Sequence, residues 1–457
     1  MNADTEYKRM TETPIKKLVT ILAIPCVISM LVSSIYNFAD TFFVSRLGES
    51  ASGAVGVVFS IMAIIQAIGF TLGMGSGANI SAKLGEKDNK EASLIASSAF
   101  FLALVLGLLV TLFGLIFLDP LMKVLGATDT VLPYAKNYAT YILIGSPIMM
   151  GTFVLNNQLR AEGKARLSMV GITIGGFLNI GLDPLFIFVF DLGIKGAAIA
   201  TLISQSVSFI ILLSFFIFKK SVLHLSLKGG FSSFRRYVDV VRLGLPSLCR
   251  QGLASLATVL LNRQAGLYGG DSALAAMSIV TKVFMIVNSV VIGIGQGFQP
   301  VAGYNYATKK FSRVKEAYLF AFILDTIVMA LLGTVFFIFS KEIIFLCIGN
   351  NDDVINIGKM ALRYQCISMP LLALNTIVNM AFQSTRMKWK ATLLSSCRQG
   401  IFFIPLVYIL PSLLKVKGVT LVQPLADVAT FVFSIPFFIW FLHHLKSENN
   451  EKQLVKE

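Results

Sequence analysis

The residues of this 457-residue sequence with the clearest potential for chemistry are aspartates that stand inside long apolar runs. Asp40 and Asp183 each lie in such a run, and Asp325 and Asp427 lie in two others. A charged carboxylate at the centre of a membrane-spanning helix costs at least about 2.5 kcal/mol on insertion scales. Each of these side chains therefore needs a partner or a function.

Polar residues stand at helical spacing from the first two aspartates. Asn37 and Tyr36 precede Asp40 by three and four residues, so they share one helix face with it. Asn179 precedes Asp183 by four residues and shares a face in the same way. Such oxygens can hold a sodium ion, or the carboxyl groups can carry protons, since burial favours the neutral acid. We predict a site for one small cation, and hydrogen bonding alone is the simpler alternative.

Three further residues are expected to shape this site. Thr201 lies in the next apolar run and could add a hydroxyl ligand. Pro184 directly follows Asp183, and Pro25 lies in the run that holds Asp40. A proline inside a helix removes a backbone hydrogen bond and bends or breaks the helix. We therefore expect both helices to shift when a cation binds.

The second half of the chain has cations where the first half has carboxylates. It has Leu261-Asn262 at the place of Asp40, and Ile404 beside Pro405 at the place of Asp183. These cations could pair with Asp325 or Asp427, extend to a membrane interface, or face an anionic or zwitterionic cargo. The candidate substrate-cavity residues are Arg250, Gln251, Lys282, Arg398 and Gln399.

The composition is that of a membrane protein. Hydrophobic residues make up 55% of the chain and charged residues only 14%. Apolar runs of roughly 20 residues, enough to cross a hydrocarbon core of ~30 Å, recur along the whole chain. We predict twelve spans, near residues 16–44, 53–82, 93–118, 132–159, 167–190, 196–218, 238–262, 273–305, 317–340, 354–384, 391–414 and 418–442.

The net charge of +15 follows the topology of these spans. One set of alternate connections, which includes both termini, holds 26 Lys and Arg residues. The other set holds 7, namely Arg46, Lys123, Lys195, Arg263, Lys341, Lys415 and Lys417. Because basic connections remain on the cytoplasmic side, we expect both termini in the cytoplasm. No basic patch interleaved with aromatic residues is present, so we expect no nucleic-acid partner.

The chain contains an internal repeat. The segment 24–77 recurs about 221 residues later as 245–297, with Pro25 matched to Pro246. Six spans per copy is an even number, so both copies enter the membrane from the same side as parallel repeats. We therefore expect an N-lobe at 1–218, a cytoplasmic linker at 219–237, a C-lobe at 238–445 and a cytoplasmic tail at 446–457.

Three segments resemble signatures of multidrug and toxic compound extrusion (MATE) transporters. The run Asn37-Phe38-Ala39-Asp40-Thr41 resembles the first-helix signature. Residues 178–188 resemble the fifth-helix signature, and 193–201 resemble the start of the sixth helix. The resemblance covers roughly residues 14–445. It implies an all-α integral membrane fold with twelve transmembrane helices, in two pseudo-symmetric six-helix lobes that form a V around a central cavity.

The resemblance also implies where the coupling ion binds. In the DinF-like branch of the family the cation site lies in the N-lobe, and its ligands fall on Asp40, Asn179, Asp183 and Thr201. These four would be the Na+ ligands if sodium is the coupling ion. Another branch has an acidic residue around the seventh and eighth helices, where this chain has cations, and this favours the DinF-like branch. The expected neighbours of the site are Tyr36, Asn37, Pro25 and Pro184.

The function that the resemblance implies is secondary active efflux of drugs and toxins in exchange for H+ or Na+, by alternating access. The protein would lie in a bacterial-type cytoplasmic membrane, contact lipid, bind small-molecule substrates and need no cofactor besides the ion. Nothing in the sequence demands a partner chain, so we expect a monomer.

The alternatives are a transporter of another cargo and an enzyme. A flippase of a lipid-linked or anionic precursor has the same two-lobe architecture, and the cations of the second half fit such a cargo. An intramembrane aspartyl protease would need paired acids, but the Gly-x-Gly-Asp motif is absent at Asp183. A phosphate-binding glycine-rich loop with lysine is absent too. We therefore do not expect an enzyme.

Overall fold

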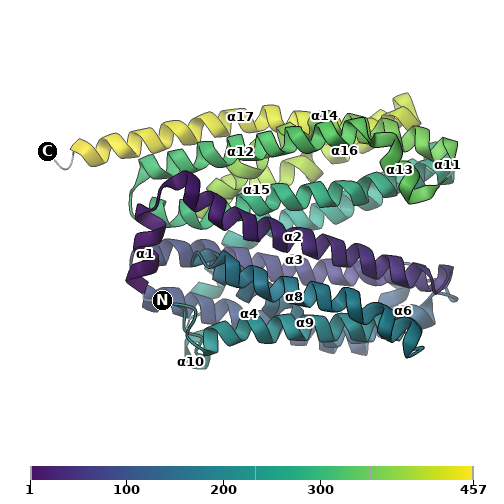
Figure 1. The fold of residues 1–457 in the computed structure, drawn as a ribbon, viewed down its shortest axis with the longest axis horizontal. Coiled ribbons are helices and arrows are strands. Elements are labelled where there is room, and N and C mark those ends of the chain that lie inside the picture. The colour runs from purple at the N-terminus through teal and green to yellow at the C-terminus, as the bar shows by residue number, and fades with distance from the viewer. Residues whose placement is uncertain (1–2, 232, 350, 455–457) are drawn as a thin grey trace.

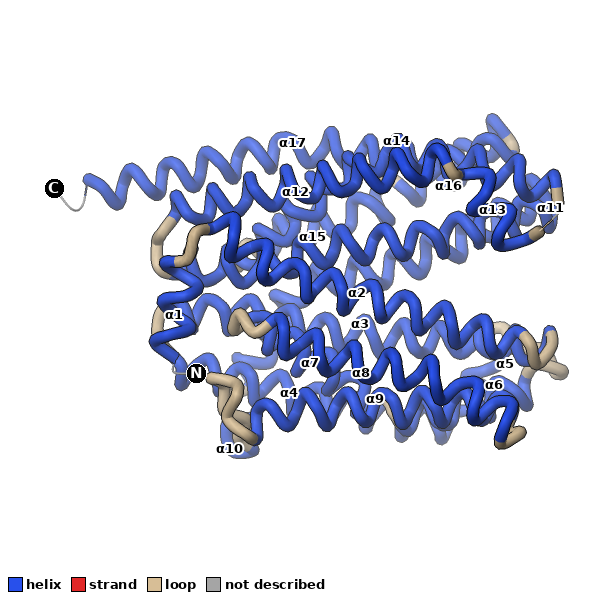
Figure 2. The backbone as a smooth tube through the Cα atoms, viewed as in Figure 1, coloured by secondary structure: helices blue, strands red, loops and turns tan. Residues whose placement is uncertain are grey.

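The computed structural model describes residues 3–231, 233–349 and 351–454, and their regular secondary structure is entirely helical. Figures 1 and 2 show long helices lying side by side along one axis, with both chain termini at the same end of the molecule. We call this end the terminal end. The first two residues of the predicted N-lobe, residue 232 of the linker and residues 455–457 of the tail lie outside the described residues.

Ten helices in the described part of the chain are long and apolar enough to cross a membrane. The helices α6 (Leu132–Ile144) and α7 (Ser146–Ala161), which meet at 49°, add an eleventh if they form one span. The prediction of a multi-span helical membrane protein is therefore confirmed. The longest helix, α11 (Phe234–Ala307), contains two helices that meet at Gly270, whose φ of 61° suits glycine.

The helices form two layers in Figure 1, one from each half of the chain. The layer of the first half contains α2 (Ile15–Ser45), α3 (Glu49–Gly85), α4 (Asn89–Ile116), α5 (Leu118–Val124), α6, α7, α8 (Ala165–Pro184), the π-turn η1 (Leu185–Val189) and α9 (Gly193–Ile217). After the short α10 (Leu227–Gly230), the second layer contains α11, α12 (Phe311–Ile338), α13 (Ser340–Ile348), α14 (Asp352–Ser384), α15 (Lys388–Ser396), the π-turn η2 (Cys397–Ile401), α16 (Phe403–Leu414) and α17 (Val416–Leu454).

Polar caps and apolar faces explain the form of these helices. The Asp88 side chain accepts a hydrogen bond from the backbone N–H of Glu91 at 3.0 Å, which satisfies a free donor at the start of α4. Large apolar side chains such as Leu112 and Ile210 are exposed on the outer faces. Such faces are stable against lipid, where every backbone group must bond within its own helix.

The two layers meet at helix crossings where glycine allows the backbones to touch. Gly75 of α3 packs against the Val240 carbonyl of α11, and Gly244 of α11 packs against the Thr71 carbonyl of α3. A second crossing brings Gly297 of α11 against Ala23 of α2. Small residues at such positions permit close approach of helices in a membrane. All of these contacts lie in the parts of the helices nearest the terminal end.

A short helix that the sequence analysis did not anticipate, α1 (Ala3–Glu12), lies across the terminal end. Arg9 donates to the Gly163 carbonyl of the first half at 2.6 Å. Asn305 of the second half donates to the Met10 carbonyl at 3.0 Å. The helix therefore ties the two halves together at this end.

A buried glutamate in the connection between α7 and α8 predicts that the stability of the folded protein depends on pH. Glu162, between α7 and α8, is 0% exposed, accepts the Val222 N–H at 2.8 Å and lies 3.5 Å from the Lys164 ammonium. Burial raises the pKa of Glu162 to about 7, against the opposing effect of Lys164. The folded state then binds more protons than the unfolded state between pH 4.5 and about 7.

We therefore expect the protein to lose stability as the pH rises through this window, by roughly 3 kcal/mol at most. Thermal unfolding in lipid nanodiscs between pH 5 and 8 measures the effect. Glu162→Gln should flatten the slope, and Glu86→Gln, at an exposed residue, should leave it unchanged. An equal slope in the Glu162→Gln variant would contradict the assignment.

Candidate functional site

The three polar residues predicted on the fifth and sixth spans do meet in the structure. The Asn179 amide of α8 donates to Asp183 Oδ1 at 3.2 Å and to Thr201 Oγ1 of α9 at 3.4 Å. Their exposed fractions are 2% for Asn179, 0% for Asp183 and 4% for Thr201. The i, i+4 spacing on α8 and the packing of α9 against it therefore build one buried polar cluster.

Asp40 joins this cluster through a residue that the sequence analysis missed. The Tyr138 hydroxyl of α6 donates to Asp40 Oδ2 at 3.0 Å, and both side chains are buried. The helices that carry these side chains pack together, α2 against α8 and α6 against α9. Tyr138 therefore links the Asp40 side of the cluster to the α8 and α9 side.

Several oxygens of this cluster have no hydrogen-bond partner within the described residues. They are Asp40 Oδ1, Asp183 Oδ2, Asn179 Oδ1 and Ser204 Oγ, all buried. Buried polar atoms in native proteins almost always have a partner. Carboxylate, amide and hydroxyl oxygens are ligands for hard cations, and the carboxylates can also accept protons. The donor set therefore fits a small cation or a proton.

The predicted neighbours occupy supporting positions. The Tyr36 hydroxyl accepts from Gln205 at 3.3 Å, and the Asn37 amide donates to the Ser33 carbonyl at 2.7 Å, so neither hydrogen-bonds to Asp40. A polar pocket beside the cluster is lined by side chains that include Tyr36, Asn179, Thr201, Ser204 and Gln205, with Gly175.

The two prolines act on the helices of the carboxylates. Pro25 lies inside α2, one turn before Ser29, whose hydroxyl donates to the Pro25 carbonyl at 2.8 Å. Pro184 ends α8, and the chain continues directly into the π-turn η1. The helix is therefore widened after Asp183 and not broken. π-turns of this kind are often found at functional sites.

The contact between Tyr138 and Asp40 yields a prediction. Tyr138→Phe removes the hydroxyl and leaves Asp40 without this donor, at little change in shape. We expect the half-saturating cation concentration for ion-driven transport to change by about 3- to 10-fold, since a hydrogen bond to a charged group is worth roughly 1 kcal/mol or more. Transport assays across a cation titration measure it. Tyr134→Phe, at an exposed residue one turn earlier, is the matched control. An unchanged titration in the Tyr138 variant would refute the link.

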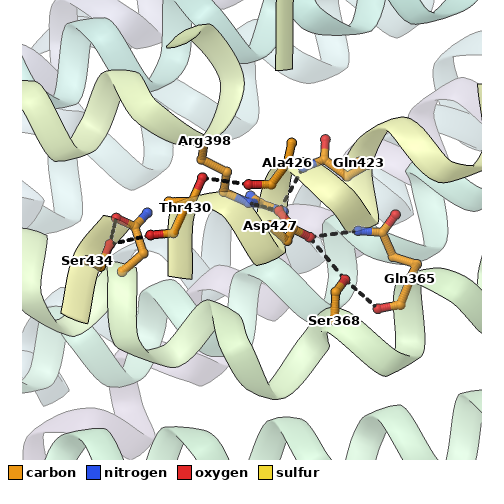
Figure 3. Close-up of polar contacts among 9 residues, drawn as sticks. Gln365, Ser368, Arg398, Gln423, Ala426, Asp427, Thr430 and Ser434 are labelled. Atoms are coloured by element: carbon orange, nitrogen blue, oxygen red, sulfur yellow. Dashed lines mark hydrogen bonds and ion pairs between the residues drawn. The ribbon is translucent and has the colours of Figure 1, made fainter. Parts of the chain in front are cut away.

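The candidate cavity residues of the second half have different surroundings. The Arg398 Nε atom lies 2.7 Å from Asp427 Oδ1, so one of the predicted pairings is present (Figure 3). The Gln399 Oε1 atom is buried without a partner among the described residues. Asp325 is 0% exposed, and its carboxyl oxygens likewise have no partner in the described part of the chain.

The remaining three cavity candidates lie on α11. The Arg250 guanidinium of α11 approaches the Met74 sulfur of α3, with Nη2 at 3.5 Å, and has no acidic partner in the described residues. Lys282 is exposed, with its ammonium 6.0 Å from the centroid of the Phe38 ring of α2. Gln251 is half-buried. Arg250 and Lys282 therefore lie where the second half faces the first.

A two-layered bundle of membrane-spanning helices with a buried, partly unsatisfied carboxylate cluster defines the class of polytopic membrane transporters. The MatE family model matches residues 25–185 and 246–409, one segment in each half, and the chain belongs to this family of transporters. The family is one of transporters and not of enzymes, as the sequence analysis expected.

Curated relatives and solved structures agree with this assignment. The chain is 26% identical over 417 residues to multidrug export protein MepA of Staphylococcus haemolyticus, covering 91% of each chain. It is 25% identical over 423 residues to MepA of Staphylococcus aureus, covering 91% of this chain and 92% of the relative.

Two solved structures superpose with a TM-score of 0.90. One is an outward-facing conformation of a multidrug resistance MATE family transporter, 26% identical, with 96% of this chain and 98% of that chain covered. The other is a transporter from Pyrococcus furiosus, 27% identical, with 97% and 98% covered, described by the reverse polarity of its binding pocket.

Proposed function

We propose that this protein is a secondary active antiporter that exports organic compounds from the cytoplasm in exchange for Na+ or H+ by alternating access. The observation that carries the proposal is the buried cluster of Asp40, Asn179, Asp183 and Thr201, with its unsatisfied oxygens. The relatives named multidrug export proteins support a drug or toxin as the cargo. Another branch of the family has an acidic residue around the seventh and eighth helices, and the cations Arg250, Arg263 and Lys282 in that region of this chain support the DinF-like branch.

We propose twelve spans, from the ten helices of sufficient length, the bent pair α6–α7, and the two helices joined at Gly270 within α11. The domain limits follow as an N-lobe at 1–218, a linker at 219–237, a C-lobe at 238–445 and a tail at 446–457. The excess of basic residues in one set of connections supports a cytoplasmic position for both termini. The terminal end would then be closed towards the cytoplasm. A monomer suffices, because one chain holds all four ligands.

The proposed cycle uses the cation as the signal that changes the preferred conformation. A cation from outside binds the cluster and neutralises its charge. Hydrogen bonds at Asp40 and Asp183 then change. The two helices that carry them then shift, namely α2, which contains Pro25, and α8, which is widened after Pro184. Ion and cargo need only prefer opposite conformations, and this coupling is reciprocal.

The test is export of ethidium in inverted vesicles with imposed sodium and proton gradients varied independently. Wild-type protein should respond to one of the two gradients, and Asp40→Asn should lose that response while remaining inserted. Asp271→Asn, at an exposed aspartate next to the Gly270 turn, is the control and should retain the response. Gradient-driven export at the wild-type rate by the Asp40 variant would overturn the proposed coupling site.

The second candidate function is a flippase for an anionic or lipid-linked precursor. The observation in its favour is Arg250, a cation between the halves without an acidic partner in the described residues. The Pyrococcus furiosus structure described by the reverse polarity of its binding pocket supports the same reading. Intact drug sensitivity under every gradient, together with loss of cell-wall or polysaccharide assembly in a deletion strain, would favour this alternative.

A further inference from the structure

The second half contains a buried ion pair that the coupling mechanism leaves unexplained. Asp427 of α17 is 2% exposed and accepts from Arg398 Nε of η2 at 2.7 Å. The same carboxylate accepts from Gln423 at 2.8 Å, and from Gln365 and Ser368 of α14 at 3.2 Å each. Figure 3 shows these side chains converging on Asp427 from three elements. A polar shell of this kind around one buried carboxylate resembles a cation site.

Repeated contacts give the register between the two halves. Asn156 donates its side-chain amide to the carbonyl 12 residues further on, at 3.2 Å. Asn379, which lies 223 positions later, does the same at 2.6 Å. The same offset relates α15 and η2 to α8, so Arg398 corresponds to Gly175 (398 − 223 = 175).

A second pair of contacts gives the register for the last span of each half. Gly196 of α9 and Gly418 of α17 each pack against a backbone carbonyl of the preceding helical segment. They differ by 222 positions, so Asp427 corresponds to Gln205 (427 − 222 = 205). Gly175 and Gln205 both line the polar pocket beside the carboxylate cluster of the first half. The ion pair of the second half therefore occupies the counterpart of that pocket.

We propose that the Arg398 guanidinium is a resident cation of the second half, held by Asp427 in the counterpart of the pocket beside the first half's cation site. The inference rests on the proposed coupling site of the first half and extends it: one half exchanges a cation with solution, and the other carries its own. Arg398 is then a residue that determines how many ions the transporter can exchange. Without it, Asp427, Ser368 and the amide oxygens of Gln365 and Gln423, after rotation of the amides, would offer oxygens to a small monovalent cation.

The test uses the full-length protein in nanodiscs and follows thermal unfolding in sodium chloride or in N-methylglucamine chloride at equal ionic strength. All variants also carry Asp40→Asn and Asp183→Asn, which remove both carboxylates of the first half's cation site. In this background Arg398→Ala should create a sodium-dependent rise in Tm of about 2–4 °C. Adding Asp427→Asn should abolish the rise. Because the background has no first-half carboxylates, the result does not depend on whether those residues couple transport.

Arg363→Ala is the matched control, because the Arg363 guanidinium contacts Ser340 Oγ at 2.9 Å and has no carboxylate partner in the described residues. It should create no sodium dependence. Absence of a sodium-dependent rise in the Arg398→Ala protein, or persistence of the rise after Asp427→Asn, would overturn the proposal. Where Arg398→Ala alone fails to fold, Asp427→Asn should restore the folded yield by removing the unpaired charge, and failure to restore it would also overturn the proposal.

Discussion

Replacing Asp183 with asparagine should make cargo binding insensitive to the coupling ion. Asp183 is 0% exposed and is held by the Asn179 amide, so its charge can be balanced only by a bound cation or a proton. Asparagine keeps the size of the side chain but remains neutral in every conformation. The variant should therefore behave at all cation concentrations as the wild-type protein behaves with the ion bound.

The size of this effect follows from ordinary coupling free energies. A coupling of 1–3 kcal/mol corresponds to about a 5- to 150-fold change in affinity, and the ion and the cargo must share the same factor. Asp183→Asn should thus lower ion-driven export by about this factor. The cargo Kd, measured by fluorescence anisotropy across a cation titration, should become constant and match the high-cation value of the wild-type protein.

Two results would decide against this role. A cargo Kd in the Asp183→Asn protein that still varies with cation concentration as in the wild type would exclude Asp183 as the coupling group. A cargo Kd that stays constant but at the low-cation value would mean that neutralisation does not mimic the bound ion. Asp271→Asn, at an exposed residue, should leave the titration unchanged and controls for the preparation.

Much of this site could be predicted from local spacing. Asn179 and Asp183 share a helix face because they are four residues apart, and the structure joins them by a hydrogen bond. Thr201 lies on α9, which a short connection joins to the segment that follows Asp183, so its place beside this helix could also be predicted. The many apolar runs likewise made a multi-span helical fold predictable, because only helices and closed barrels satisfy their backbones in lipid.

Contacts between distant segments could not be predicted in this way. Tyr138 reaches Asp40 across 98 positions, and no periodic pattern relates the two. Asp427 likewise accepts hydrogen bonds from Gln365 and Ser368 of α14, about 60 positions away in the sequence. Such pairings depend on which helices pack together, and a hydropathy pattern carries no information on that choice.

The crossing of the two halves yields the second large effect. Gly244→Ala should open the terminal end, because a Cβ atom at this position would collide with the backbone carbonyl of Thr71. A backbone atom cannot turn aside as a side chain can, so α3 and α11 must separate. Overpacking of this kind costs about 1–3 kcal/mol. That cost applies only to the conformation in which the helices touch, and it shifts the equilibrium by about 5- to 150-fold towards the separated conformation.

The measurement is the distance between two spin labels, one attached at position 90 and the other at position 315. These positions are exposed lysines on α4 and α12 at the terminal end. Gly244→Ala should lengthen the main distance and lower export. Gly252→Ala lies on the same helix, where no atom approaches within 4 Å of the added Cβ, and it should change neither quantity. Unaltered distances in the Gly244 variant, with normal export, would show that this crossing does not hold the terminal end closed.

The second crossing tells whether the two halves move as units. Gly297 packs against the backbone of Ala23 on α2, on the other side of the interface between the halves. If the halves pivot as rigid bodies, both crossings must open and close at the same time. Gly297→Ala must then lengthen the distance between the two labels, as Gly244→Ala does. If only one variant lengthens it, then α2 or α3 moves independently of its layer. Pro25 would then favour α2 as the independent element, since this proline removes a backbone hydrogen bond of α2 close to the crossing and α3 contains no proline.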